Sequence, residues 1–149
     1  MKRFVFKLDN VLKYRETLEN LAKNAYSEAL RLFHIEKNKL VALETKRDHL
    51  KAAYDVKAGS VTMPDVLSFL NNYSGQLLFL IGQQREVTSE KEKVVREKFA
   101  DWNRKRRDVK IMKRLEEKKK QEYLRQVDKE EQKFQDEIFI AKTVREMVR

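Results

Sequence analysis

The residue types that carry catalysis or bind metals are scarce in this sequence. It contains two histidines, His34 and His49, which stand fifteen positions apart with no metal-ligand spacing around them, and no cysteine. Catalytic and zinc-binding histidines occur in sets whose spacing brings several ligands or a nucleophile together. We therefore interpret both histidines as solvated helix residues, and we predict no metal site and no cofactor.

The acidic residues and the glycines also give no sign of a catalytic site. The acidic pairs, Glu116 with Glu117, Glu130 with Glu131 and Asp136 with Glu137, lie among lysines and arginines. That mixture is typical of a solvated helix face. The three glycines are isolated from one another, so they cannot form a phosphate-binding loop. The sequence predicts no catalytic residue and a protein that is not an enzyme.

The cysteine content and the apolar runs indicate where the protein resides. A chain without cysteine has no disulfide framework, which fits a reducing compartment. Residues 1–12 lack the apolar core of a signal peptide, and the longest apolar run, residues 77–81, is far too short to span a bilayer. We expect a soluble cytoplasmic protein that does not insert into a membrane.

The positive charge of the chain is concentrated in one segment. The net charge is +10, and residues 104–120 hold ten Lys or Arg against three Asp or Glu. A basic helix can follow a phosphate backbone, but a basic zipper needs a leucine seam directly after it, where this chain has Glu116, Lys119 and Gln126. Few aromatic residues are interleaved for base stacking. We interpret the segment as a solvated face or a surface for an acidic protein groove, and we predict no nucleic-acid partner.

The chain from Pro64 onward reads as one long helix. No further proline follows, and the last two glycines, Gly75 and Gly82, lie near its start. Its first apolar stripe comprises Val66, Leu70, Tyr73, Leu77, Leu80, Val87 and Val94. Farther along, apolar residues fall seven apart: Val95, Trp102 and Val109, and then Val127, Phe134, Ala141 and Val148. A sustained seven-residue period with charged residues between is typical of a coiled coil.

A second apolar stripe precedes Pro64 and can pair with this helix. Its positions are Leu8, Val11, Arg15, Leu18, Ala22, Ala25, Ala29, Leu32, Glu36, Leu40, Leu43, Arg47, Leu50 and Tyr54. The two successive four-residue steps from Leu32 through Glu36 to Leu40 predict a stutter, which locally relaxes a left-handed supercoil. Asp9 or Asn10 can cap the start of this helix.

A short turn separates the two helices. Gly59 is suited to the left-handed conformation that ends a helix. Thr62, followed three positions later by Asp65, resembles a capping box, and Pro64 falls in the first turn of the second helix. Two amphipathic helices joined by so short a loop lie antiparallel.

The predicted fold is all-α: a long antiparallel two-helix coiled-coil hairpin that forms a single domain over residues 1–149. We place helix 1 at about residues 5–57, the loop at residues 58–63 and helix 2 at about residues 64–147; the start of helix 1 ahead of Asp9 is the one that a family resemblance implies. At 1.5 Å per residue the first helix spans about 75 Å and the second about 130 Å, so the C-terminal part of helix 2 overhangs the first from about residue 115.

Two apolar surfaces are left over by this pairing. The overhang still carries apolar residues, which indicate either self-association and fraying or a partner's groove. Residues 77–81 are apolar all round the helix and are flanked by Gly75 and Gly82, each of which lowers helix propensity. This stretch indicates either tight packing near the loop or a docking surface for another protein.

The chain resembles FliJ, the small coiled-coil component of the flagellar type III export apparatus. The matching stretches are residues 6–16 (FKLDNVLKYRE), Ala58 with Gly59 ahead of the second helix, the series Tyr73, Leu77, Leu80, Gln84 and Arg85, Trp102 within a basic stretch, and residues 131–137 (EQKFQDE). Each stretch is weak alone. Their order, the loop position and the total length carry the resemblance over essentially the whole chain.

The resemblance implies a non-enzymatic stalk-like protein that supports flagellum assembly and motility. It would be cytoplasmic and peripherally associated with the inner membrane face at the flagellar base. Its partners would be the hexameric flagellar export ATPase, the cytoplasmic domain of the membrane export-gate protein, and the export chaperones that it escorts. The family's gate-contact surface falls by position on Tyr73, Leu77, Leu80 and Gln84. The end held by the ATPase would comprise Tyr123, Val127, Phe134 and Ile138, with Leu8 and Leu12 beside them.

Two other functions stay open. A generic structural coiled coil would use the leftover apolar surfaces for self-association. A stalk subunit of a rotary ATPase usually adds a globular insertion between its helices, where this chain has about six residues.

Overall fold

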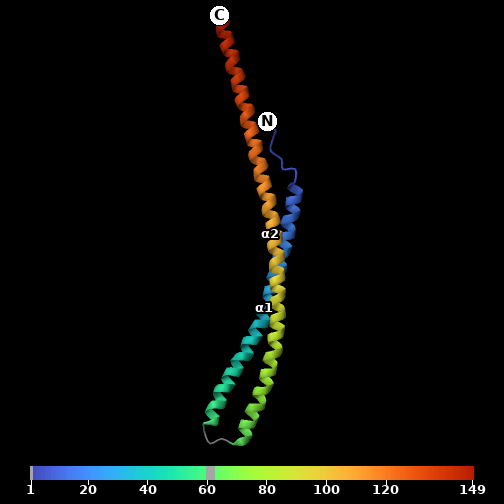
Figure 1. Ribbon diagram of the computed structural model, residues 1–149, viewed down its shortest axis with the longest axis vertical. Helices are drawn as coiled ribbons and strands as arrows, with labels where there is room; N and C mark the ends of the chain where they lie inside the picture. Colours follow the sequence, from blue (N-terminus) through green and yellow to red (C-terminus); the bar gives the residue numbers. More distant parts are fainter. Residues whose placement is uncertain (1, 60–62) are drawn as a thin grey trace. The chain divides into compact units, whose positions relative to one another are not determined.

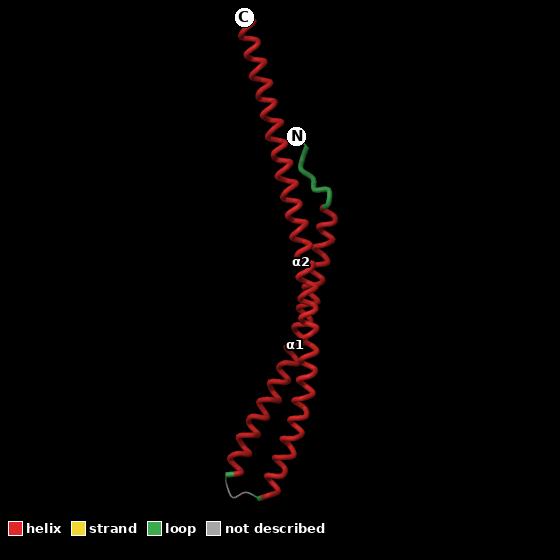
Figure 2. The backbone as a smooth tube through the Cα atoms, viewed as in Figure 1, coloured by secondary structure: helices red, strands yellow, loops and turns green. Residues whose placement is uncertain are grey.

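Two long helices make up the protein. The computed structural model describes residues 2–59 and 63–149, and its helices are α1 (Asp9–Ala58) and α2 (Pro64–Val148). Figure 1 shows the two helices, and Figure 2 shows an extended segment that precedes α1. No strand occurs in the described ranges. The prediction of an all-α helical hairpin is confirmed.

The helix ends follow local chemistry. α2 begins at Pro64, where the missing N–H has no intrahelical partner to lose, and Asp65 places a negative charge in the first turn. α1 begins at Asp9 for the same electrostatic reason. The last turns carry Lys57 in α1 and Arg145 in α2, which complement the negative end of each helix dipole.

The chain divides into two compact units, each with its own core. The central unit is Asn20–Asn103, and the terminal unit consists of the residues up to Glu19 together with Arg104–Arg149. Within each unit a part of α1 runs antiparallel to a part of α2 (Figure 1).

The core of the central unit is a narrow seam between the helices. Leu40, Leu77 and Ile81 are buried there, and Leu43 and Leu50 pack against them. The inward positions of α1 are Ala22, Tyr26, Ala29, Phe33, Glu36, Leu40, Leu43, Arg47 and Leu50. Their steps alternate between four and three residues, as in an uninterrupted heptad repeat.

The predicted stutter in α1 is therefore wrong. The expected series passed through Leu32, but that side chain is exposed, and Phe33 lies inward instead. Two helical turns earlier, Tyr26 lies inward and stacks on Trp102 with ring centroids 5.4 Å apart. Because two aromatic side chains occupy these inward positions, the heptad continues without a double four-residue step.

The core of the terminal unit draws on residues that precede α1. Phe6 and Leu12 are buried against Val109 and Met112 of α2, and Phe4 and Leu115 pack on this cluster. Residues 2–6 are not helical, and the backbone N–H of Asp9 donates to the carbonyl of Phe6 at 3.2 Å. Helix 1 therefore starts at Asp9 rather than at about residue 5, because an extended segment brings Phe4 and Phe6 onto α2.

The turn after α1 also differs from its prediction. No described glycine has a positive φ, so Gly59 does not adopt the left-handed conformation. Its N–H donates to the carbonyl of Asp55 at 3.2 Å, which continues the i to i−4 pattern of the helix. The predicted capping box depends on Thr62, which lies outside the described residues.

Candidate docking surfaces

The four residues predicted to contact the export gate do not share one face. Leu77 is 3% exposed in the seam, and Gln84 is half-buried. Tyr73 and Leu80 are exposed, Leu80 at 47%. While the helices stay paired, Tyr73 and Leu80 can offer surface to a partner and Leu77 cannot.

Two parallel stripes on α2 explain this division. The inward stripe, whose steps alternate between four and three, is Leu70, Ser74, Leu77, Ile81, Gln84, Thr88, Lys91 and Val95. The second stripe, which we term the apolar flank, is Val66, Tyr73, Leu80, Val87 and Val94. Its members stand seven apart and are each 38–47% exposed. A seven-residue spacing keeps all five on one side of the seam.

The apolar flank contains a hollow that a side chain can enter. A cavity of about 430 Å³ opens between Leu80 and Val87, and Leu43 and Gln84 form part of its lining. The other side of the seam differs in character, because Arg85 of α2 lies 3.2 Å from Glu44 of α1 in an ion pair. One side of the seam is therefore closed by a charge pair at this level, and the other presents apolar surface.

A polar layer crosses the seam beside the hollow. The side-chain amide of Gln84 donates to the carbonyl of Glu36 at 3.0 Å and to its carboxylate at 2.6 Å. The hydroxyl of Thr88 is 3.5 Å from the same carbonyl and donates to the carbonyl of Gln84 at 2.8 Å. The hydrogen bond from Gln84, with a smaller contribution from Lys39, lowers the pKa of Glu36.

The two glycines near the flank are not needed for packing within the chain. A Cβ added at Gly75 or Gly82 would meet no atom within 4 Å in the described structure. Both positions are exposed on α2. The apolar stretch between the glycines divides: Leu77 and Ile81 pack in the seam, whereas Leu78, Phe79 and Leu80 are exposed.

The residues predicted for the ATPase-binding end are spread along the terminal unit. Leu12 is buried, whereas Leu8 is exposed. Tyr123 is half-buried because its ring contacts that of Phe4, with centroids 5.6 Å apart. Val127 is half-buried, and Phe134 and Ile138 are exposed on the part of α2 beyond it. The structure brings Leu12 to the core and Tyr123 to the N-terminal segment, and it leaves Phe134 and Ile138 open.

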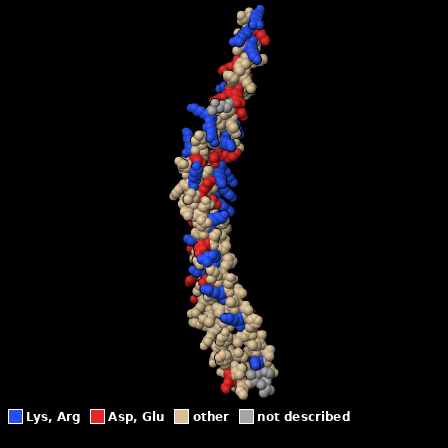
Figure 3. Space-filling model, turned by 180° about the vertical axis from the view of Figure 1, so that it is seen from behind, with Lys and Arg blue, Asp and Glu red and all other residues tan. Residues whose placement is uncertain are grey.

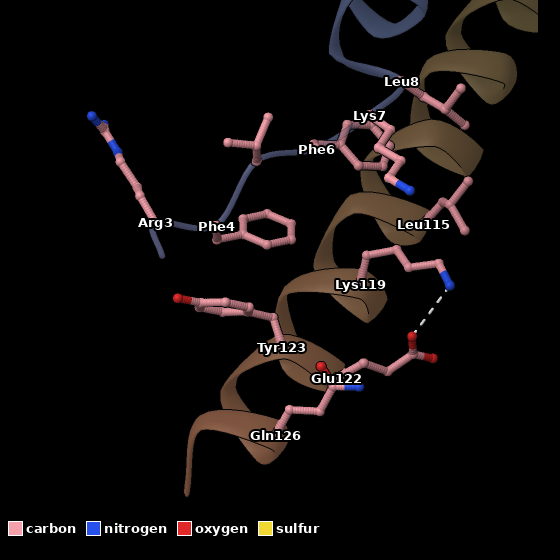
Figure 4. A pocket seen from close by; sticks show the side chains of 11 residues that line it. Arg3, Phe4, Phe6, Lys7, Leu8, Leu115, Lys119, Glu122, Tyr123 and Gln126 are labelled. Atoms are coloured by element: carbon pink, nitrogen blue, oxygen red, sulfur yellow. Dashed lines mark hydrogen bonds and ion pairs between the residues drawn. The ribbon is translucent and has the colours of Figure 1, made fainter. Parts of the chain in front are cut away.

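Sequence reasoning missed the N-terminal segment, which we term the strap (residues 2–8). Phe4 and Phe6 face α2, while Val5 between them is 74% exposed. Figure 4 shows the rings of Phe4 and Phe6 directed toward α2 and its Leu115 and Tyr123. Residues that face α2 thus alternate with an exposed residue at a period of two, as in an extended segment.

The basic segment of α2 buries two apolar residues and exposes most of its cations, while Ile111 between the buried pair is 58% exposed. Val109 and Met112 are buried, and Arg107, Lys110 and Arg114 are exposed. In Figure 3 the blue side chains crowd this part of the terminal unit. The ammonium of Lys113 lies 4.0 Å from the carboxylate of Glu16 in α1. This ion pair is weak, because both side chains are exposed to solvent that screens their charges.

Among the described residues, the histidines and acidic residues do not converge into a catalytic or metal site. His34 and His49 are exposed, and the ring of His34 lies 5.6 Å from that of Phe33. No group of three potential metal ligands converges in residues 2–59 and 63–149. Within the same ranges neither helix has a stretch that is both long and apolar enough to cross a bilayer.

Comparison with known proteins places this helical hairpin in a family. A solved structure described as a putative YscO homolog, CT670 from Chlamydia trachomatis, superposes with a TM-score of 0.54 at 20% sequence identity, covering 91% of this chain and 93% of that one. At that identity the likeness concerns the fold. No curated protein matches the sequence. Residues 4–147 match the family described as Flagellar FliJ protein, and the chain therefore belongs to the flagellar FliJ family.

Proposed function

We propose that this protein is a non-enzymatic, cytoplasmic component of the flagellar type III export apparatus that links the export ATPase to the membrane export gate. It acts by binding, because it changes its partners' conformations through differential contacts rather than through chemistry. Escort of export chaperones belongs to the same role. The protein is associated with the inner membrane face at the flagellar base through these partners rather than through insertion.

The observation that carries the proposal is the apolar flank. A two-stranded coiled coil needs apolar residues only at its two seam positions, and the neighbouring positions are usually charged. Here Tyr73, Leu80 and Val87 extend the apolar surface outside the seam at seven-residue spacing. Such a stripe suits an amphipathic helix or a hydrophobic groove of a partner, with the hollow beside Leu80 receiving one of its side chains.

In this proposal Tyr73 and Leu80 contact the gate, together with Val87, because these three residues of the flank are exposed. Leu77 and Gln84 support the surface from the seam, since Leu77 packs against Leu40 and Gln84 bonds to Glu36. The ATPase-binding role falls on the exposed part of α2 in the terminal unit, which carries Phe134 and Ile138.

The test compares two aspartate substitutions in the flank with one beside it. Leu80→Asp with Val87→Asp is expected to lower the affinity for the purified cytoplasmic domain of the gate at least tenfold, because each charge would have to be desolvated at the interface. Phe79→Asp is the matched control, since Phe79 is also exposed but is turned about 100° away around the helix. All variants should keep the wild-type helicity by circular dichroism.

The comparison shows whether the gate binds the apolar flank or the surface around Phe79. Wild-type gate affinity in the flank variant, or a loss that is equal in Phe79→Asp, would refute the assignment of this surface. Light scattering of the isolated chain tests whether the flank serves self-association. A stable dimer that the flank variant dissociates would mean that the flank serves self-association instead.

A further inference from the structure

The strap lies where α1 no longer covers α2. Leu12, in the first turns of α1, packs on Val109 and Met112. Beyond those residues α2 continues with Leu115, Lys119, Tyr123 and Gln126, which succeed one another at three or four positions and so lie on one face. The strap lies along this face and, with these four residues, lines one hollow (Figure 4).

The strap is held by few contacts. Phe6 is 8% exposed in the core, the ring of Phe4 contacts that of Tyr123, and the hydroxyl of Tyr123 donates to the carbonyl of Lys2. Within the residues described, two backbone hydrogen bonds tie the strap to the start of α1: the Asp9 N–H donates to the Phe6 carbonyl at 3.2 Å, and the Leu12 N–H donates to the Leu8 carbonyl at 2.9 Å. An extended segment cannot pair its backbone with a helix whose own N–H and C=O groups are already bonded.

Solvent-accessible hollows flank the strap. The hollow between strap and α2 has a volume of about 500 Å³, and a second of about 370 Å³ lies between Lys2, Tyr123 and Val127. Both hollows are open to solvent, so they add no packing contacts to the strap. A segment with two packed rings, few backbone hydrogen bonds and solvent along its borders has a low free energy of local opening.

We propose that the strap is a displaceable cover that competes with a partner for the face of α2 formed by Leu115, Lys119, Tyr123 and Gln126. In the isolated protein the strap occupies this face. When a partner groove binds the exposed apolar residues Phe134 and Ile138, its contact can extend toward the core only if the strap leaves. The inference rests on the proposed function for the identity of that partner, the export ATPase, but not for the position of the strap.

The first arm of the test needs no partner. In the full chain, Phe4→Ala with Phe6→Ala is expected to speed amide hydrogen exchange over residues 115–127 at least threefold, while Val5→Ala, whose side chain is exposed, leaves it unchanged. Phe4→Ala alone serves as a second variant, because it keeps Phe6 in the core. Unchanged exchange in both Phe4 variants would overturn the inference.

The second arm measures affinity for the purified export ATPase. Loosening the strap through Phe4→Ala should raise the affinity about threefold or more, and Val5→Ala should not change it. An equal or weaker affinity in Phe4→Ala would show that the strap does not compete. If the wild type fails to bind the ATPase while exchange responds as expected, the strap is supported as a cover and the ATPase is eliminated as the partner, so the two failures stay distinct.

Discussion

Substituting Ile81 and its neighbour Leu80 by alanine tests which apolar stripe of α2 forms the seam. Ile81 is 2% exposed and packs with Leu40 and Leu77, whereas Leu80 is 47% exposed. Each substitution removes three carbon atoms. At about 0.8 kcal/mol per buried methylene, Ile81→Ala loses roughly 2.4 kcal/mol of transfer free energy plus a cavity contribution, or about 3 kcal/mol in all. Leu80→Ala should lower the free energy of unfolding by about 1 kcal/mol, because about half of that side chain is already in water.

The assay is urea denaturation followed by circular dichroism. With a denaturant slope of about 2 kcal/mol per molar, Ile81→Ala should lower the midpoint by roughly 1.5 M and Leu80→Ala by roughly 0.5 M, with unchanged slopes. The reasoning is refuted if Leu80→Ala proves as destabilising as Ile81→Ala. That result would place the apolar flank, rather than the stripe through Ile81, between the helices. Comparing the two variants cancels the uncertainty of the unfolded reference state.

Three further predictions follow from the geometry. Because the pKa of Glu36 lies below its usual value of 4.5, its contribution to stability is present above pH 4.5 and is lost as the pH falls through the lowered pKa. In an acid titration of thermal stability, Gln84→Ala should reduce that loss, and an equal loss would contradict the role of the bond. Gly75→Ala and Gly82→Ala should each raise the free energy of unfolding by about 0.5–1 kcal/mol, because nothing surrounds the added Cβ; a lower melting temperature would show a contact that the prediction omits. Deleting residues 128–149 should abolish ATPase binding in a pull-down while the strap contacts remain, and retained binding would move the ATPase site elsewhere.

Much of the fold was predictable from local sequence alone. The absence of proline after Pro64 and the persistence of the seven-residue period predict the long helix, and the structure ends it at Val148, one residue from the prediction. These features depend on neighbours along the chain, so sequence reasoning reaches them. The start of α2 at Pro64 follows from the same local rules.

The phase of the seam was not predictable, because α2 carries two apolar stripes with the same period. One passes through Leu77 and Ile81, and the other passes through Tyr73, Leu80 and Val87. Both satisfy the heptad rule, and the choice depends on which stripe α1 can match across the seam. The predicted gate site mixed residues from the two stripes for this reason.

The strap escaped prediction for a different physical reason. Phe4 and Phe6 are too close in sequence to lie on one side of a helix, but they share a side in an extended segment. The segment is extended because Phe4 and Phe6 pack on one face of α2, and that face is more than one hundred positions away in the sequence. A pattern of so few residues does not distinguish an extended strap from a frayed helix end.

The polar layer gives the two stripes their different roles. Gln84 and Thr88 both reach the carbonyl of Glu36, and neither bond can form if α2 rotates to bring Leu80 inward. Apolar side chains at these two positions would bury more area, but they would remove the difference between the stripes. A polar residue at a seam position is a known means of fixing register at a cost in stability. We therefore interpret the layer as the element that keeps Leu80 and Val87 on the surface, where a partner can bind them.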